Sequence, residues 1–392
     1  MVHVAGRIML LSGLTRAVVA FVAGALAVLA LAPFDFCAVL FVSFPLLVWL
    51  LDGASGDADA GSLRRLIPAF WTGWWFGFGY FLAGLWWLGA ALLVEADSFA
   101  WALPLAVLGL PAVLAIFYGL AAALARAFWS DGVGRIAALA FAFGLVEWLR
   151  SFVFTGFPWN AVGYGFMPIP LMMQSVHVIG LFSMNVLTVF VASAPALIVT
   201  RRGAWAGMGI AVVLFAAHIG YGTFVLMTAP DPVREATGKP VFRIVQPSIS
   251  QTARMDNQES NRIFGEYLKL SAIPPAKGGR RPDYIVWPET AVPFVLTENP
   301  AALQSIGRML EPGQTLITGA VRVEEGAPGD KPRYYNSILV VDDKGEIIAA
   351  ADKLHLVPFG EYMPFADFFT WLGVPAIAMP GGFSPGTVRS TL

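Results

Sequence analysis

The most constraining feature of this sequence is the uneven distribution of its charge. Residues 1–229 contain 17 Asp, Glu and Arg side chains and no lysine, whereas residues 230–392 contain the other 34 charged residues. The whole chain is 57% hydrophobic and only 13% charged, whereas an average soluble domain carries about 25% charged residues. We therefore predict a helical membrane domain over residues 1–229 and a water-soluble domain over residues 230–392.

Seven apolar segments of the first domain reach or approach the length of about 20 residues that a helix needs to cross a bilayer. They are residues 16–32, 36–51, 68–93, 101–126, 135–153, 171–199 and 205–227. Arginines lie before the first segment and after the second, fourth and sixth, and the alternate connections carry acidic residues, with Arg150 as the exception. The positive-inside rule then predicts a cytoplasmic amino terminus. An odd number of spans places the second domain on the periplasmic side of a bacterial inner membrane.

A few polar residues interrupt these segments. Glu147 and Arg150 are three residues apart, so they share a helix face, and we interpret them as a structural ion pair, with a functional role as the alternative. His177 and His218 each stand alone in apolar sequence, and we expect packed or helix-bonded histidines rather than metal ligands. Cys37 is the only cysteine, which excludes an intrachain disulfide, and we expect it to be a small buried hydrophobic residue.

The second domain alternates strand and helix patterns, which is typical of a layered α/β domain. Strands are predicted over residues 241–245, 284–287, 315–323, 337–341 and 347–351, and helices over 256–271 and from the Asn299 cap through residue 310. The net charge of −1 argues against a nucleic-acid partner, which requires a basic surface.

Four ionisable residues follow strand ends in this domain. Glu289 comes shortly after the second strand, and Lys353 after the fifth. In an extended chain His355 would face the same side as Lys353, and Glu361 lies in the loop that follows. Open α/β sheets bind ligands at the carboxyl ends of their strands, which favours a site here. Each residue taken alone would be a solvated or capping side chain.

These motifs resemble those of the apolipoprotein N-acyltransferase family, bacterial membrane enzymes whose outer domain belongs to the nitrilase superfamily. The resemblance covers the whole chain. It rests on E-W-L-R and T-G-F-P-W between residues 147 and 159, V-Q-P-S-I at 245–249, W-P-E at 287–289 and, most specifically, K-L-H-L-V-P-F-G-E-Y-M-P at 353–364. It implies about seven membrane helices followed by a nitrilase-like α-β-β-α sandwich that is incomplete at its carboxy end.

The resemblance also implies a Glu-Lys-Cys triad, with Glu289 and Lys353 in the first two places and Glu361 as a second essential glutamate. Trp287, His355 and Met255 are candidate substrate-binding residues, and many members of the family carry a tryptophan near Met255. The nucleophilic cysteine lies a little beyond the G-G-F-S-P-G stretch at 381–386 in the family. We therefore expect it beyond Leu392, and we expect a chain ending there to be truncated and inactive.

The implied reaction moves an acyl chain from a phospholipid, usually phosphatidylethanolamine, to the α-amino group of a diacylglyceryl-cysteine on an apolipoprotein, through a cysteine thioester. Its partners are the phospholipid, the apolipoprotein and the surrounding membrane lipids. No metal or cofactor is expected, because the ester itself supplies the acyl group.

Two other functions remain open. One is a membrane-tethered amidase or nitrilase-like hydrolase, and the other is a transporter or sensor with an outer binding domain. The helical membrane domain favours lipid substrates over small soluble amides. The charged residues gather at the ends of the apolar segments rather than at their midpoints, which disfavours a transporter.

Overall fold

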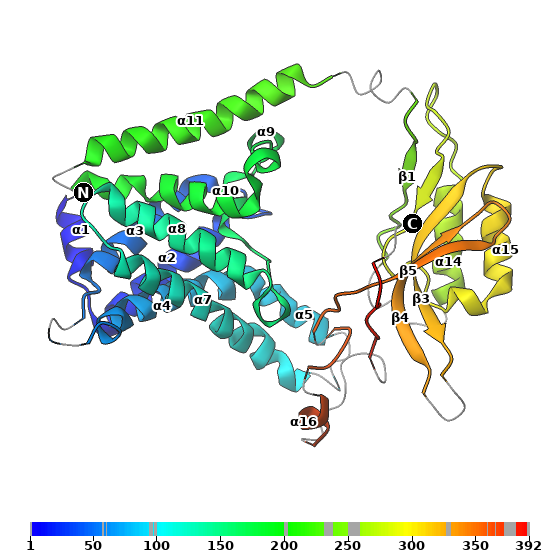
Figure 1. Ribbon diagram of the computed structural model, residues 1–392, viewed down its shortest axis with the longest axis horizontal. Helices are drawn as coiled ribbons and strands as arrows, with labels where there is room; N and C mark the ends of the chain where they lie inside the picture. Colours follow the sequence, from blue (N-terminus) through cyan, green and yellow to red (C-terminus); the bar gives the residue numbers. More distant parts are fainter. Residues whose placement is uncertain are drawn as a thin grey trace. The chain divides into compact units, whose positions relative to one another are not determined.

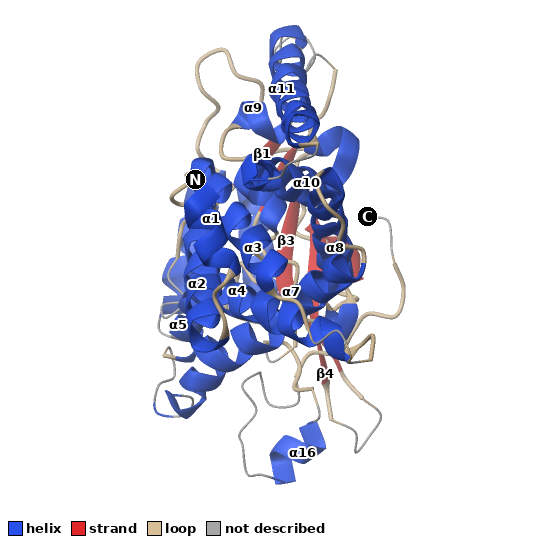
Figure 2. Cartoon of the chain, turned by 90° about the vertical axis from the view of Figure 1, so that its left-hand side faces the viewer, coloured by secondary structure: helices blue, strands red, loops and turns tan. Residues whose placement is uncertain are grey.

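The computed structural model describes residues 2–56, 59, 61–93, 97, 100–199, 203–230, 238–249, 259–326, 331–358, 360–364, 366–371 and 382–389. The chain divides into two compact units, Met1–Ala229 and Pro230–Leu392 (Figure 1). The first is built from helices and the second contains the β-sheet (Figure 2). We call them the helical unit and the sheet unit.

Among the described residues, the helical unit consists of α-helices joined by loops, short 3-10 turns and one π-helical turn at Leu105–Gly109. The α-helices are α1 (Val2–Met9), α2 (Gly13–Ala27), α3 (Leu40–Gly53), α4 (Ile67–Leu85), α5 (Gly89–Leu92), α7 (Leu110–Ala127), α8 (Val133–Arg150), α9 (Pro170–Met173), α10 (Val176–Ser193) and α11 (Ala204–Thr228). The backbone leaves helical geometry at Gly180 inside α10, where φ is 72°.

Each of the seven predicted apolar segments overlaps one of the longer helices. Among the described residues, five helical stretches are long and apolar enough to cross a membrane: Gly13–Ala30, Arg64–Leu92, Ala100–Ala127, Val176–Val199 and Ala204–Thr228. Cys37–Gly53 is apolar but shorter, and α8 carries Arg135, Glu147 and Arg150. The prediction of several apolar helices in this part of the chain is therefore confirmed.

Close packing of α4 depends on small residues. A Cβ atom on Gly24 of α2 would lie 1.8 Å from the Phe76 carbonyl oxygen of α4, and one on Gly73 of α4 would lie 2.4 Å from the Tyr118 carbonyl oxygen of α7. Small residues at these crossings let the helix backbones approach, which is how helices associate where no water drives them together.

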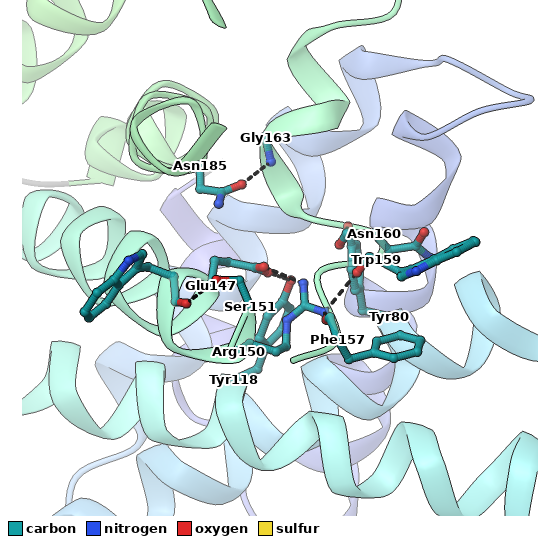
Figure 3. A network of polar contacts seen from close by, with 11 residues as sticks. Tyr80, Tyr118, Glu147, Arg150, Ser151, Phe157, Trp159, Asn160, Gly163 and Asn185 are labelled. Atoms are coloured by element: carbon teal, nitrogen blue, oxygen red, sulfur yellow. Dashed lines mark hydrogen bonds and ion pairs between the residues drawn. The ribbon is translucent and has the colours of Figure 1, made fainter. Parts of the chain in front are cut away.

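Glu147 and Arg150 form a buried ion pair at the carboxyl end of α8 (Figure 3). Tyr118 of α7 donates its hydroxyl to Glu147 Oε1 at 2.6 Å, and Arg150 Nη1 donates to the carbonyl oxygen of Trp159 at 2.9 Å. The guanidinium also bonds to the Phe157 carbonyl oxygen and lies over the Phe81 ring. Arg150 is therefore neutralised inside the helical unit, which explains why it departs from the alternation of arginines in the sequence.

A second ion pair lies at the other end of α8. Arg135 contacts Asp52, from the end of α3, at 2.7 Å, and the indole N–H of Trp129 donates to the same carboxylate at 2.9 Å. The side chains of Arg135 and Asp52 are 9% and 13% exposed. Both ends of α8 are thus attached to neighbouring helices by charged contacts.

The two histidines of the apolar segments differ. His218 is buried, and its ring nitrogens lie 2.9 Å from Ser175 Oγ and 3.0 Å from the Phe166 carbonyl oxygen, as expected for a packed histidine. His177 is exposed, so it is not a packed histidine, and the alternative of a helix-bonded side chain stays a prediction. Cys37 is a free, partly buried residue that packs against the apolar core of the helical unit.

The sheet unit contains five strands in the order β1-β2-β3-β4-β5: β1 (Phe242–Ile244), β2 (Tyr284–Val286), β3 (Thr315–Glu324), β4 (Arg333–Val341) and β5 (Ile347–Asp352). The first three strands are parallel, and β4 and β5 are antiparallel to their neighbours. All five lie where the sequence predicted strands, although β4 begins at Arg333 rather than at residue 337.

Helices α14 (Ser260–Ser271) and α15 (Pro300–Met309) lie on the same side of the sheet (Figure 1). Asn299 caps α15 by accepting a hydrogen bond from the Ala302 amide at 3.1 Å, as predicted. Apolar residues of alternate strand positions pack beneath these helices, including Ile285, Leu316 and Leu339. The neighbouring positions face the other way, and Phe242, Ile244 and Ile338 among them are 53%, 79% and 45% exposed.

Candidate active site

Glu289 lies where the chain crosses from β2 over the neighbouring strand β3. The amide of Ala291 donates to the carbonyl oxygen of Gly319 at 3.0 Å, and Thr290 has a positive φ of 48°. A Cβ atom on Gly319 would lie only 2.5 Å from the Cα of Glu289. Gly319 therefore provides the space through which this segment passes, and it fixes the place of the Glu289 side chain.

Lys353 directly follows β5 and is held by backbone bonds on both sides. Its amide donates to the carbonyl oxygen of Asn336 on β4 at 2.8 Å, and its carbonyl oxygen accepts from the amide of Gly386 at 2.9 Å. The lysine is thus placed by an extension of the β4–β5 pairing and by the segment Gly382–Arg389.

The structure brings three of the predicted residues together. Lys353 Nζ lies 3.1 Å from Glu289 Oε1 and 2.9 Å from Glu361 Oε1. The Glu361 side chain is 11% exposed and that of Lys353 30%, whereas that of Glu289 is 62% exposed. We call Glu289, Lys353, Glu361 and the neighbouring Asn336 the acid–lysine cluster.

Asn336 is the residue of this cluster that sequence reasoning missed. Its side-chain amide donates to Glu289 Oε1 at 2.5 Å and to Glu361 Oε1 at 2.7 Å. The two N–H groups of one amide thus join the two carboxylates. A single signal in the sequence could have found it, because asparagine is depleted in strands and Asn336 stands in one.

Glu361 is held as a carboxylate by several donors. Burial alone would raise the pKa of Glu361, but hydrogen bonds from the Val357 amide, Lys353 and Asn336 outweigh burial and lower this pKa below its ordinary value. The Val357 amide donates to Oε2 at 2.7 Å. Glu361 is therefore a fixed negative charge beside the lysine.

Lys353 is held as an ammonium group. Burial alone would lower the pKa of Lys353, but its hydrogen bonds to Glu361 and Glu289 outweigh burial and raise this pKa above its ordinary value. An ammonium group has three N–H donors, and among the described residues two of them go to these carboxylates. One donor remains for an oxygen of a bound molecule.

The segment Gly382–Arg389 lies beside the acid–lysine cluster. The amide of Phe383 donates to the Glu361 carbonyl oxygen at 2.7 Å, and that of Ser384 to the Tyr334 carbonyl oxygen at 2.7 Å. Residues 382–386 belong to the glycine-rich stretch that the family resemblance places before the nucleophile. They therefore contact the backbone of both Glu361 and Lys353.

Trp287 and His355 are the other two predicted site residues that the structure describes. Trp287 is 2% exposed, donates its indole N–H to Ser271 Oγ at 2.9 Å and packs on Tyr267 of α14, so it belongs to the core beneath the helices rather than to the exposed side of the cluster. The chain bends at His355 instead of continuing extended, and this histidine is exposed. Met255 lies outside the described residues.

Two family models match the chain. The model described as apolipoprotein N-acyltransferase N-terminal domain matches residues 23–194, within the helical unit. The model described as carbon-nitrogen hydrolase matches residues 244–382, within the sheet unit, and this stretch contains all four residues of the acid–lysine cluster.

Curated proteins named apolipoprotein N-acyltransferase match the whole chain. The protein of Rhizobium leguminosarum bv. trifolii is 62% identical over 395 residues, which is 100% of this chain and 74% of the relative. The protein of Rhizobium rhizogenes is 60% identical over 394 residues, with the same coverage of 100% and 74%. The protein of Brucella suis biovar 1 is 58% identical over 391 residues, covering 100% of this chain and 73% of the relative.

Proposed function

The chain belongs to the apolipoprotein N-acyltransferase family, and from that premise we propose that it transfers an acyl chain from a phospholipid to the amino-terminal amine of an apolipoprotein. Its apolar helices and its relatives make it a multi-pass membrane protein. The observation that carries the proposal is the convergence of Glu289, Lys353 and Glu361 from three separate segments of the sheet unit.

Glu289 is the proposed general base. A base that receives protons from successive substrates needs an open side, and this carboxylate is the most exposed member of the acid–lysine cluster. Among the described residues, its hydrogen bonds from Lys353 and Asn336 both end on Oε1. Those bonds orient the group and leave Oε2 to receive a proton.

Lys353 is the proposed electrostatic stabiliser. Attack on an ester carbonyl concentrates negative charge on the carbonyl oxygen, and a fixed donor aimed at that oxygen lowers the barrier. The remaining ammonium N–H can serve this purpose, because Glu361 and Glu289 fix the position of Nζ. Glu361 and Asn336 hold this arrangement in place.

The nucleophile in the proposed reaction is a cysteine thiol, which the family resemblance places beyond Leu392. Glu289 takes the thiol proton, and sulfur attacks the ester carbonyl carbon. The carbon–oxygen bond then breaks, and the departing lysophospholipid takes the proton from Glu289. The apolipoprotein amine attacks the resulting thioester, nitrogen replaces sulfur, and Glu289 accepts the amine proton.

The compartment and the donor are also part of the proposal. The arginine pattern favours a sheet unit on the periplasmic side of the inner membrane. Phosphatidylethanolamine is the donor that we propose, as implied by the family resemblance. Both substrates would then be lipids of the same leaflet and could reach the site laterally.

Substitution of Glu289 by glutamine tests the assignment in the full-length protein. Glutamine keeps the size of the side chain but cannot accept a proton, so the acyl-enzyme should not form. The measurement is the labelling of the protein by a phospholipid with a fluorescent acyl chain, followed by release with hydroxylamine, which cleaves thioesters. Thioester labelling at the wild-type rate would refute the role of Glu289.

The match to carbon-nitrogen hydrolases supports one competing function, a membrane-tethered amidase. The two functions share the acyl-enzyme and differ in the molecule that resolves it. With a labelled phospholipid and a diacylglyceryl-peptide, an acyltransferase yields an N-acylated peptide, whereas a hydrolase yields free fatty acid. The proportion of the two products decides between them.

A further inference from the structure

A second charged group lies on the opposite face of the strands that carry the acid–lysine cluster. Arg322 of β3 donates to both carboxylate oxygens of Asp352 on β5, with Nε at 3.0 Å from Oδ1 and Nη2 at 2.7 Å from Oδ2. Ser337 of β4 donates its hydroxyl to Oδ1 at 2.6 Å. We call these three residues the strand clamp, because they join three adjacent strands.

The contacts of the strand clamp fix the position and orientation of the Asp352 carboxylate. Two parallel bonds from a planar guanidinium fix the orientation of a carboxylate as well as its distance. The guanidinium carbon of Arg322 also lies 4.3 Å from the centre of the Tyr335 ring, and Arg322 and Asp352 are 24% and 22% exposed. The hydrogen bonds from Arg322 are the main cause that lowers the pKa of Asp352 below its ordinary value.

Asp352 is the residue directly before Lys353. In a strand, successive side chains point to opposite faces, so fixing Asp352 on one face directs Lys353 to the other. The same peptide is confined by the segment Gly382–Arg389, since a Cβ atom on Gly386 would lie 2.8 Å from the Asp352 carbonyl oxygen. Rotation of this peptide is therefore opposed from the sheet and from the neighbouring segment.

We propose that Arg322, acting through Asp352, is a positioning residue that holds the Lys353 ammonium between Glu289 and Glu361. This inference rests on the proposed function for its catalytic meaning. Its structural content, that Lys353 leaves the two carboxylates when the strand clamp is broken, can be measured without acyl transfer.

The experiment measures the reactivity of Lys353 toward an amine-acylating reagent as a function of pH. The chain has six lysines, so peptide mass spectrometry resolves each one, and Lys344 in an exposed turn is the internal reference. The variant is Arg322→Met, and the control is Arg281→Met, which removes an exposed arginine bonded to Glu311 in the same unit.

Arg322→Met should raise the labelling rate of Lys353 at pH 9, relative to Lys344, by about tenfold, the effect of lowering a pKa by one unit. The direction in which the relative labelling rate of Lys353 changes decides between two explanations. Loss of a nearby positive charge, acting alone, would raise the pKa of Lys353 and slow the labelling, whereas displacement from Glu289 and Glu361 speeds it. Arg281→Met should leave the ratio unchanged. A ratio at or below the wild-type value in Arg322→Met overturns the proposal.

Arg322→Lys covers the case in which the methionine variant does not fold. It retains the charge and one bond to Asp352, and it should give a labelling ratio between those of the wild type and Arg322→Met. A ratio at or below the wild-type value again overturns the proposal.

Asp352→Asn combined with Arg322→Met should change the labelling ratio by no more than the larger of the two single variants, because both changes break one clamp. Additive effects would show that Arg322 does not act through Asp352. If the labelling results hold while Glu289→Gln retains acylation, the clamp stands and the proposed chemistry fails.

Discussion

The two units each contain a group of acidic, basic and amide or hydroxyl side chains, and the groups differ in exposure. Glu147 and Arg150 in the helical unit are both 1% exposed, and their partners include Tyr118 and the carbonyl oxygens of the following loop. Glu289 and Lys353 in the sheet unit are 62% and 30% exposed. The residue types are alike, so the types alone do not separate a structural pair from a reactive one.

The difference lies in what remains available to another molecule. In the helical unit the charges are enclosed by side chains and backbone of the unit itself, so the network holds a loop against the helices. In the acid–lysine cluster, one carboxylate is enclosed and the other is open. A fully enclosed charge pair has no side left for a substrate, whereas a fixed group with an open side can react.

Breaking the enclosed pair should have the largest effect on stability. Arg150→Met leaves Glu147 as a buried charge without its partner, and removal of one member of a buried pair costs about 3–5 kcal/mol. The measurement is the free energy of unfolding in detergent. The double variant Glu147→Gln, Arg150→Met carries no buried charge and should recover much of the loss. A single variant as stable as the wild type would contradict the structural role.

Removing the lysine of the acid–lysine cluster should affect activity rather than stability. Lys353→Ala eliminates the proposed donor to the developing oxyanion, a loss of about 10²–10³-fold in turnover. The rate of acyl-enzyme formation by the full-length protein is the quantity to measure. Arg281→Met in the same unit is the matched control. A rate within a few-fold of the wild type would remove Lys353 from the mechanism.

A methyl group at Gly319 should disturb the cluster without changing any of its members. Gly319→Ala places a Cβ atom within 2.5 Å of the Glu289 Cα, so the crossing segment must move. Displacement of a reacting group by about 1 Å can cost about 10²-fold in rate, and we expect a loss of about 10- to 100-fold. Gly313→Ala is not a suitable control because Gly313 has a positive φ of 80°. Gly265→Ala is suitable, since open space surrounds Gly265 on α14. Equal rates in the two alanine variants would contradict this account.

Lowering the pH should reduce the free energy of unfolding of the sheet unit, and we expect this to be the smallest of the predicted effects. The pKa of Glu361 is lower in the folded protein than in the unfolded chain, so its contribution to stability is present above the unfolded value of about 4.3. This contribution is lost as the pH falls through the lower, folded pKa. Denaturant midpoints of the sheet unit between pH 6 and pH 3 measure the loss, and Glu361→Gln should flatten the dependence. An unchanged slope in that variant would assign the effect to other carboxyl groups.

The elements themselves were largely predictable from sequence, because apolar length and strand alternation are local patterns. The site was predictable only in part. Glu289 and Lys353 lie in recognisable motifs, but Asn336 meets carboxylates 47 and 25 residues away, and only the register of β4 against β3 and β5 brings them together. Tyr334 and Tyr335 are of a residue type that is enriched in strands. The predicted strand nevertheless began at residue 337 and so left Asn336 outside it.

The W-P-E motif led to the wrong role for Trp287, whereas strand alternation places this residue correctly. It shares the parity of Ile285, so period-two alternation places it beneath the helices, where it is found. Glu289 has the same parity and would also point into the core if the strand continued. The chain instead leaves the strand at Pro288 and crosses over Gly319, which brings Glu289 to Asn336 on the opposite face. A break in the backbone, rather than a pattern of residue types, separates a core residue from a candidate catalytic one.

The charged contacts at both ends of α8 have a mechanical consequence. Arg135 is attached to Asp52 of α3 at one end of this helix. At the other end, Glu147 accepts a hydrogen bond from Tyr118 of α7, and Arg150 donates to the Trp159 carbonyl oxygen. Sliding of α8 by one turn, about 5.4 Å, would break both attachments and leave charges in an apolar surrounding. Helix α8 is therefore held at a fixed axial position relative to α3 and α7. A thicker or thinner bilayer must be met by tilting the bundle as a whole or by deforming the lipids around it.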